Sequence, residues 1–360
     1  MRTTRRGFLA VAATGLVTAA CSPELGSNNS PLTIATSGAL PPDQVLDPQL
    51  RIILPGQAIA PSTFTSFARS TGVRVIQTQA PGDAELLLEL ETTLAGKIDL
   101  VLVDAATVTS QVTLGRFETL DPSLLPNLKN LEPPFSNPPY DRNSHHSVGL
   151  DYTTVGIALA PAVRLDPSAS WQGLFALAAV SPGSVSVPDD PATVVGAALV
   201  ARGHSWNSDS SSDLADAEQF LHSLRGSLVV RAGTAPATYG TGLAAIVTSL
   251  QAAAANLRYV VPVDGTVASM RSLCIPIEAP DPVSAHAWLS HVLDPITAAA
   301  DVTYSRRGTP LRGASYLVPQ SLLTDQTVFP SPAALATIGF ASITPAGLAD
   351  RLEVWNRVKP

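Results

Sequence analysis

The alternation of short apolar runs with helical patterns constrains the fold of this chain more than any other feature. Between residues 51 and 103 the pattern predicts a strand, a helix, a strand, a helix and a strand, at Arg51–Leu54, Ser62–Ser70, Val73–Gln77, Ala84–Leu94 and Asp99–Val103. This order predicts a parallel sheet with helices on its faces. Ligands of such sheets bind beyond the carboxyl ends of the strands, which here are residues 55–57 and 104–106.

A second alternation predicts a second α/β lobe. Its expected strands and helices are Val155–Leu159, a helix that begins at Trp171, Val185–Val187, Ala192–Ala201, Asp213–Leu224, Leu228–Arg231 and a unit at Leu243–Ala255. Two lobes are also expected from length, because 360 residues exceed what one hydrophobic core usually organises.

The stretch Pro262–Pro276 is expected to connect these lobes. An apolar run, Leu257–Val263, leads into a turn at Asp264 and Gly265, and a second apolar run follows at Leu273–Pro276. We interpret the stretch as a return from one lobe to the other, so that its middle would lie at a cleft. The predicted organisation is therefore lobe 1 at 49–157 and 264–360, closed by a last helix at Ala346–Val358, and lobe 2 at 158–263.

Composition excludes several classes of function. The formal charge of −7 argues against nucleic acid as a partner. No sequence motif of a hydrolase, a zinc protease or a nucleotide-binding loop is present, so we expect no enzyme activity, no cofactor and no metal. Cys274 lies in an apolar run and is expected to be a small buried side chain.

The first 21 residues have the pattern of an export signal. Arg5 and Arg6 precede an apolar run, Phe8–Ala20, that is too short to span a bilayer. The segment is similar to twin-arginine signals, and Val17–Cys21 is similar to a lipobox, so Cys21 is a candidate for lipidation. Ordinary cleavage after Ala20 is the alternative. Residues 22–48 are rich in Ser, Asn, Pro and Gly and are expected to form a flexible tether.

Several stretches in the same order resemble one family, the spermidine/putrescine-binding proteins of ABC importers. They are Phe67–Val75, Asp99–Val101, Leu120–Leu128, Val155–Ile157, Ser170–Leu174, Gly203–Asp209, Tyr304–Pro310 and Val328–Pro330. The resemblance covers about 50–358. It implies a type II periplasmic-binding-protein fold, in which two α/β lobes with a hinge close on a ligand in the cleft between them. It also implies an ABC permease as partner and a location outside the cytoplasm.

The ligand site of that family is not retained. Polyamines need carboxylates for their ammonium groups and aromatic walls for their methylene chain. Non-aromatic residues occupy the family's aromatic positions, at Pro55, Ala58, Ala106, Thr248 and Ser269. Arg271 stands where the family has an aspartate, whereas Asp190 matches a family carboxylate and Tyr152 stands where an aromatic residue is common. The candidate ligand-binding residues are Gln57, Asp104, Tyr152, Asp190 and Arg271.

An arginine at that position reverses the local charge, so we expect a small polar ligand, anionic or zwitterionic, rather than a standard polyamine. The alternative is that Arg271 pairs with Asp190, Asp264 or another acid and holds the cleft together. A basic loop with Arg306, Arg307 and Arg312 is expected to be solvated rather than to face the ligand.

Two functions remain open from the sequence. The first is a monomeric solute-binding lipoprotein of an ABC importer, held at the bacterial cell membrane through Cys21. The second is an envelope lipoprotein, a sensor or interaction module, that keeps the fold without transport.

Overall fold

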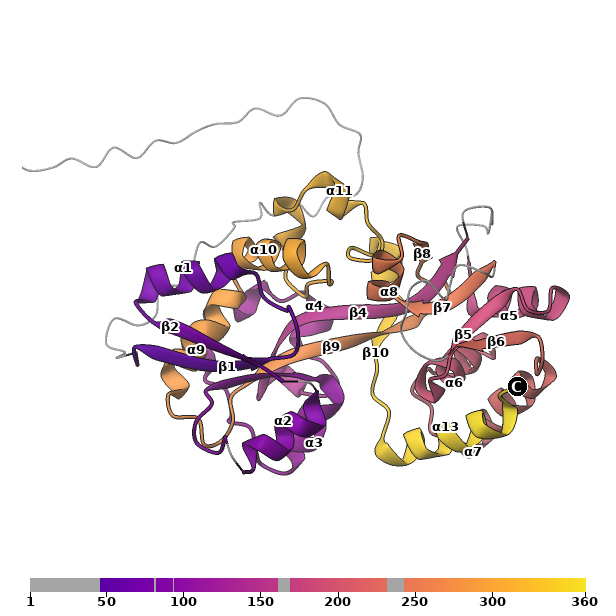
Figure 1. Ribbon diagram of the computed structural model, residues 1–360, viewed down its shortest axis with the longest axis horizontal. Coiled ribbons are helices and arrows are strands. Elements are labelled where there is room, and N and C mark those ends of the chain that lie inside the picture. Colours follow the sequence, from indigo (N-terminus) through magenta and orange to yellow (C-terminus); the bar gives the residue numbers. More distant parts are fainter. Residues whose placement is uncertain (1–45, 81, 93, 161–168, 232–242) are drawn as a thin grey trace, which may run out of the picture. The chain divides into compact units, whose positions relative to one another are not determined.

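One mixed sheet runs through the part of the chain that the computed structural model describes, residues 46–80, 82–92, 94–160, 169–231 and 243–360 (Figure 1). Within these residues, ten strands follow the order β2-β1-β3-β9-β4-β7-β5-β6, with β10 paired to β9 and β8 paired to β4. The expected export signal, the lipidation of Cys21 and residues 22–45 of the expected tether lie outside the described residues.

The strands are β1 (Gln49–Leu54), β2 (Arg74–Gln79), β3 (Leu100–Asp104), β4 (Ser147–Leu159), β5 (Val185–Pro188), β6 (Leu228–Arg231), β7 (Ala244–Thr248), β8 (Arg258–Val260), β9 (Thr266–Cys274) and β10 (Ile338–Phe340). The helices are α1 (Pro61–Thr71), α2 (Asp83–Leu90), α3 (Ala105–Thr113), α4 (Pro133–Ser136), α5 (Trp171–Val180), α6 (Pro191–Ala201), α7 (Ser211–Ser223), α8 (Ser249–Ala254), α9 (Pro282–Val292), α10 (Pro295–Ser305), α11 (Gln320–Leu323), α12 (Pro332–Leu335) and α13 (Pro345–Val358).

The parallel sheet expected from the first alternation is present. β1 pairs in parallel with both β2 and β3, and β5 pairs in parallel with β6 and β7. The two parallel groups are joined by antiparallel pairs of β3 with β9, β9 with β4, and β4 with β7. The α/β fold class predicted from the sequence is therefore confirmed.

The strands of the first group are covered on both faces. Alternate side chains of β1 enter different cores: Leu50, Ile52 and Leu54 pack with α1 and α9, whereas Ile53 packs with α2 and α3. Figure 1 shows α1 on one side of β1 and both α2 and α3 on the other. Because a strand with both faces covered needs apolar residues at successive positions, the run Ile52–Leu54 fits its place in the sheet.

The second group has its own core, built from α5, α6 and α7 around β5 and β7. Val354, Trp355 and Val358 of α13 belong to this core. We expected the last helix to close lobe 1, and this assignment is wrong, because its apolar face packs on α6 and α7 instead. The other lobe boundaries stay a prediction.

β4 and β9 are longer than the sequence suggested. β4 spans Ser147–Leu159 and is buried throughout, although the expected strand began only at Val155. Residues 147–154 of β4 pair with β9, and residues 155–159 pair with β7. β4 therefore links β9, which pairs with β3 of the first group, to β7 of the second group. That the stretch containing β9 connects two lobes stays a prediction. The turn before β9 is as expected, with Gly265 at a φ of 102°.

Three smaller expectations concern absences and burial. Cys274 is fully buried, as predicted. Among the described residues, no helix combines the length and the hydrophobicity that crossing a bilayer requires. No cluster of three or more metal-ligating side chains was found in the same part of the chain.

Candidate ligand-binding site

Three neighbouring strands place charged residues in one row. In the pairing of β3 with β9, Asp104 lies opposite Arg271, and in the pairing of β9 with β4, Arg271 lies opposite Asp151. Residues that are directly opposite across a sheet project from the same face. The register therefore brings an acid, an arginine and a second acid together where β3 ends and the loop after β1 begins.

Arg271 is held by Asp151 through two hydrogen bonds. Its Nε donates to Oδ1 of Asp151 at 2.8 Å, and its Nη2 donates to Oδ2 at 2.5 Å. Nη1 donates to the carbonyl oxygen of Pro55 at 3.3 Å, which ties the pair to the end of β1. The sequence left open whether Arg271 pairs with an acid or faces a ligand. The structure pairs it with an acid, and that acid is Asp151.

A second arginine shares the same carboxylate. Nε of Arg307 donates to Oδ1 of Asp151 at 2.7 Å. The side chain of Asp151 is 6% exposed, and those of Arg271 and Arg307 are 11% and 14% exposed. Burial by itself would raise the pKa of Asp151, but the two guanidinium charges and their hydrogen bonds hold it below its ordinary value. Asp151 is thus a buried, ionised anchor for two cations.

The structure corrects the expectation that the basic loop is solvated, at Arg307. The basic loop was expected to be solvated, and this holds for Arg306, whose side chain is 52% exposed and pairs with Asp325. It is wrong for Arg307, because its side chain forms an ion pair with the buried carboxylate of Asp151 and is only 14% exposed. Within the described residues, only Nε of its guanidinium has an acceptor, so both terminal amino groups of Arg307 keep their donors for other partners.

The acidic end of the row is more open to solvent. Asp104 is exposed and stands at the start of α3, where its carboxylate makes no hydrogen bond to the described residues. Asp83 lies beside it and accepts from the backbone N–H of Asp104 at 2.9 Å and from the hydroxyl of Thr107 at 2.6 Å. Desolvation and the Asp83 carboxylate raise the pKa of Asp104, against the lowering effect of Arg271 and Arg307. Two acids therefore face two arginines across this edge.

The structure brings together some of the predicted site residues. Asp104 and Arg271 are neighbours, and the exposed Gln57 follows Pro55 in the loop after β1. Tyr152 is separated from them, because successive side chains of a strand point to opposite faces. Its ring is buried and stacks on Phe135, with ring centroids 5.2 Å apart.

Asp190 has a structural role at the start of α6. Its carboxylate accepts from the backbone N–H groups of Ala192 and Thr193 at 3.2 and 3.3 Å, which caps the helix. Its contribution to ligand binding stays a prediction, as do those of Gln57 and Asp104.

Sequence reasoning did not select Asp151 and Arg307 as site residues. Nothing in the spacing of residues 151, 271 and 307 indicates that they meet. Their pairing depends on strand register and on the return of the chain after α10, where Gly308 and Tyr152 exchange backbone hydrogen bonds of 2.9 Å. Gly308 permits this close approach, since a Cβ there would lie 2.4 Å from the Tyr152 ring.

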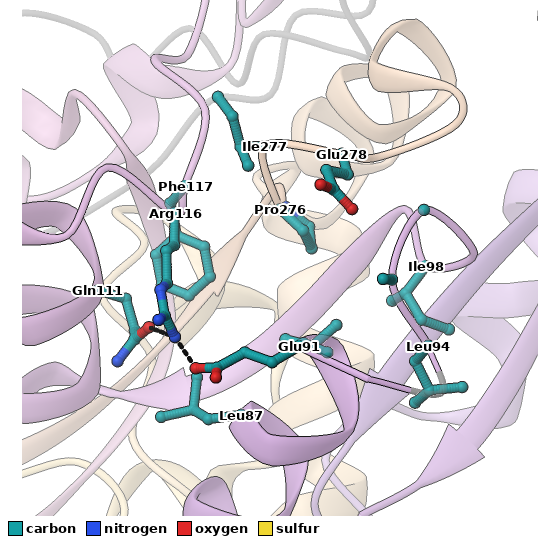
Figure 2. Close-up of a pocket in the computed structure, with 13 residues that line it drawn as sticks. Leu87, Glu91, Leu94, Ile98, Gln111, Arg116, Phe117, Pro276, Ile277 and Glu278 are labelled. Atoms are coloured by element: carbon teal, nitrogen blue, oxygen red, sulfur yellow. Dashed lines mark hydrogen bonds and ion pairs between the residues drawn. The ribbon is translucent and has the colours of Figure 1, made fainter.

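A cavity of about 240 Å³ lies at the other end of β3, away from the charged row. Figure 2 shows its apolar walls, which include Leu94, Ile98 and Phe117, and the ion pair of Arg116 with Glu91 at its side. Because Ile98 precedes β3 and Asp104 ends it, the cavity and the charged row are separate features. We take the charged row as the candidate site because several charged groups converge there, although the larger cavity lies elsewhere.

Comparison with known proteins identifies the class. Residues 62–321 match the family model described as bacterial extracellular solute-binding protein. The chain therefore belongs to this family of solute-binding proteins, which is not a class of enzymes, and the resemblance found in the sequence is confirmed.

Its relatives include periplasmic proteins named for polyamine binding. The chain is 26% identical over 284 residues to the spermidine/putrescine-binding periplasmic protein of Escherichia coli, covering 76% of this chain and 80% of the relative. It is also 26% identical over 305 residues to the putrescine-binding periplasmic protein SpuD of Pseudomonas aeruginosa, covering 76% and 81%. The chain is thus similar to polyamine-binding periplasmic proteins over most of its length.

Solved structures share the fold at lower identity. The substrate-binding protein PotD of Streptococcus pneumoniae superposes with a TM-score of 0.79 at 21% identity, covering 87% of this chain and 98% of that one. A protein described as the Atu4243-GABA receptor superposes with a TM-score of 0.64 at 20% identity, covering 86% and 96%. The two-lobed periplasmic-binding-protein fold expected from the resemblance is thereby established.

Proposed function

We propose that this protein is the membrane-anchored substrate-binding lipoprotein of an ABC importer, and that its ligand is a zwitterion rather than a standard polyamine. Family membership supports the transport role. The unused donors of Arg307 beside the Asp151 anchor carry the proposal about the ligand. A ligand carboxylate or phosphate would take those donors, because a guanidinium binds planar oxyanions through paired hydrogen bonds.

The positively charged end of the ligand is assigned to two acids, Asp83 and Asp104. Asp83 and Asp104 give the start of α3 two negative charges, and the carboxylate of Asp104 is exposed. An ammonium group suits this position. A ligand with one ammonium and one carboxylate would therefore meet an opposite charge at each end of the row.

A diamine fits this arrangement poorly. Its first ammonium could bind at the acids, but its second would approach Arg307 and Arg271. Two like unit charges about 4 Å apart repel by roughly 4 kcal/mol at an effective dielectric of 20. This corresponds to about a thousandfold in affinity. The fold does not restrict the ligand to polyamines, since a structural neighbour is described as a GABA receptor.

Isothermal titration calorimetry with two matched ligands tests the proposal. Putrescine and 4-aminobutyrate both have a four-carbon backbone, and they differ in whether the second end is an ammonium or a carboxylate. A second pair, cadaverine and 5-aminopentanoate, repeats the comparison with one more methylene. We expect the amino acid of at least one pair to bind at least a hundredfold more tightly than its diamine. Micromolar binding of putrescine or spermidine would refute the proposal.

A neighbouring arginine gives a matched control. Arg307→Gln should weaken binding of the amino acid at least tenfold, because a charge-assisted hydrogen bond contributes about 1.5–3 kcal/mol. Arg306→Gln removes the same charge from the adjacent, exposed residue and should leave affinity within about twofold. Equal effects of the two substitutions would show that Arg307 acts only through long-range charge.

The anchor is proposed at Cys21. One acyl chain binds a membrane weakly, whereas several chains anchor a protein stably, so a lipidated Cys21 would hold the protein beside its permease. In the native host, metabolic labelling with an alkyne fatty acid should mark the wild-type protein and leave Cys21→Ser unmarked. Label on both proteins, or on neither, would contradict lipidation at this residue.

A further inference from the structure

Asp301 is a buried carboxyl group whose two oxygens have different surroundings. It lies on α10 and is 6% exposed. Oδ1 accepts from the backbone N–H of Ala60 at 2.8 Å and from the hydroxyl of Thr63 at 2.6 Å, at the start of α1. Oδ2 is buried and has no hydrogen-bond partner among the described residues. A buried carboxylate oxygen without a donor is costly to keep ionised.

Asp301 lines a small cavity together with two charged residues of the candidate site, Asp151 and Arg307. The cavity has a volume of about 10 Å³ and is lined by Asp301, Asp151 and Arg307 among apolar neighbours such as Ala58 and Leu150. This volume has room for about one water-sized group, so it is no ligand cavity. It does place Asp301 on the same small space as Asp151 and Arg307, which form the anion-binding end of the proposed site.

The charges around Asp301 are few and identifiable. Among the described residues, Asp151 of β4, Arg307 of the loop after α10 and Val292 of α9 line the cavity with Asp301. Thr63 of α1 donates to Asp301, and the titratable His291 of α9 contacts α1 at Ser66. Burial raises the pKa of Asp301 to about 7, and the negative charge of Asp151 adds to this effect. Both protonation states of Asp301 are therefore populated near neutral pH.

We propose that Asp301 couples ligand binding to the uptake of a proton. The inference rests on the proposed function, in which the anionic group of the ligand binds Arg307. When Asp301 is ionised, it adds a second carboxylate to the surroundings of Arg307 and opposes an incoming anion. When Asp301 is protonated, this opposition is removed. By reciprocity, a bound anion makes Asp301 hold its proton more tightly, so the ligand and the proton bind together.

Calorimetry of 4-aminobutyrate and 5-aminopentanoate tests the coupling directly. At pH 7, titrations in buffers with different ionisation enthalpies should show uptake of a fraction of one proton per ligand. Between pH 7 and 8.5 the affinity should fall by up to tenfold per pH unit, which is the limit for one linked proton. Below about pH 6 it should be constant, until the ligand carboxyl group itself is protonated.

Asp301→Asn supplies the decisive variant. Its amide oxygen can still accept from Ala60 and Thr63, and its charge is fixed at zero. We expect affinity at pH 8.5 at least tenfold above wild type and no dependence on pH between 6 and 8.5. Asp325→Asn is the matched control, because Asp325 pairs with the exposed Arg306, and it should keep the wild-type pH dependence.

The outcomes separate this inference from the proposed function. Amino-acid binding without proton uptake, or an Asp301→Asn variant that keeps the wild-type pH dependence, overturns the inference alone. Absence of binding by either amino acid at every pH overturns the proposed ligand class and the inference with it. Thermal melting of the variant verifies that it is folded, and the buffer series on the wild-type protein requires no variant.

Discussion

Replacing Asp151 by asparagine should destabilise the protein strongly, because this residue is the shared counter-charge of two buried arginines. Three hydrogen bonds of 2.5–2.8 Å join its carboxylate to Arg271 and Arg307. Breaking a buried ion pair by removal of one partner costs about 3–5 kcal/mol. Because the arginine side chains are 11% and 14% exposed, solvent screening is small. We therefore expect a loss of at least about 3 kcal/mol.

Urea denaturation, followed by tryptophan fluorescence and circular dichroism, measures this loss. The chain has four tryptophans, so fluorescence reports on both parallel groups of the sheet. Asp325→Asn is a suitable control, since it frees the exposed Arg306 and should cost less than about 1 kcal/mol. If Asp151→Asn were no more destabilising than this control, Asp151 would not be the anchor that the distances indicate.

Two further measurements sharpen the test. The native pKa of Asp151 lies below its unfolded value of 3.8, so its stabilising contribution is complete above that pH and is lost as the pH falls through the native value. The difference between wild type and variant should shrink as the pH falls below 4, where the carboxylate of Asp151 becomes protonated. Adding Arg307→Gln to Asp151→Asn should restore part of the stability, because it removes one of two like charges.

Three other changes have expected outcomes. The raised native pKa of Asp301, about 7 against 3.8, means that stability should fall by up to about 4 kcal/mol as pH rises from 3.8 to 7. Chemical denaturation of Asp301→Asn across this range should show most of that fall removed. Gly308→Ala should cost roughly 1–3 kcal/mol in urea denaturation, since its Cβ would overlap the Tyr152 ring. Trp355→Phe should lower stability by about 1–2 kcal/mol, because it loses the 2.6 Å hydrogen bond from Nε1 to Asp189.

Local patterns predicted most of the elements but not all of their lengths. Helices such as α1 and α6 begin and end within a few residues of their expected bounds, because proline at the start and apolar spacing are local signals. The first half of β4 was missed because residues 147–154 mix polar and apolar side chains. That segment is a strand through its pairing with β9, and pairing between distant segments leaves no local pattern.

The sequence indicated some residues of the candidate site but not the residues with which they pair. The reversal of charge at Arg271 was visible in the sequence, and so was the position of Asp104 after a buried strand. The partner of Arg271 was not, because Asp151 is 120 residues away along the chain. α13 illustrates the same limit, since its amphipathic pattern shows that it packs but not on which core.

The buried thiol of Cys274 can be used to measure how often the central strands of the sheet separate. The residue lies on β9 between Val101 of β3 and Ser147 of β4, in the middle of the sheet. Its thiol is inaccessible to reagents, and burial also raises its pKa, which suppresses the reactive thiolate. In a Cys21→Ser background, the rate of modification by a thiol reagent would report how often these central strands separate. A ligand that stabilises the native state should slow that labelling, so the same assay can rank candidate solutes.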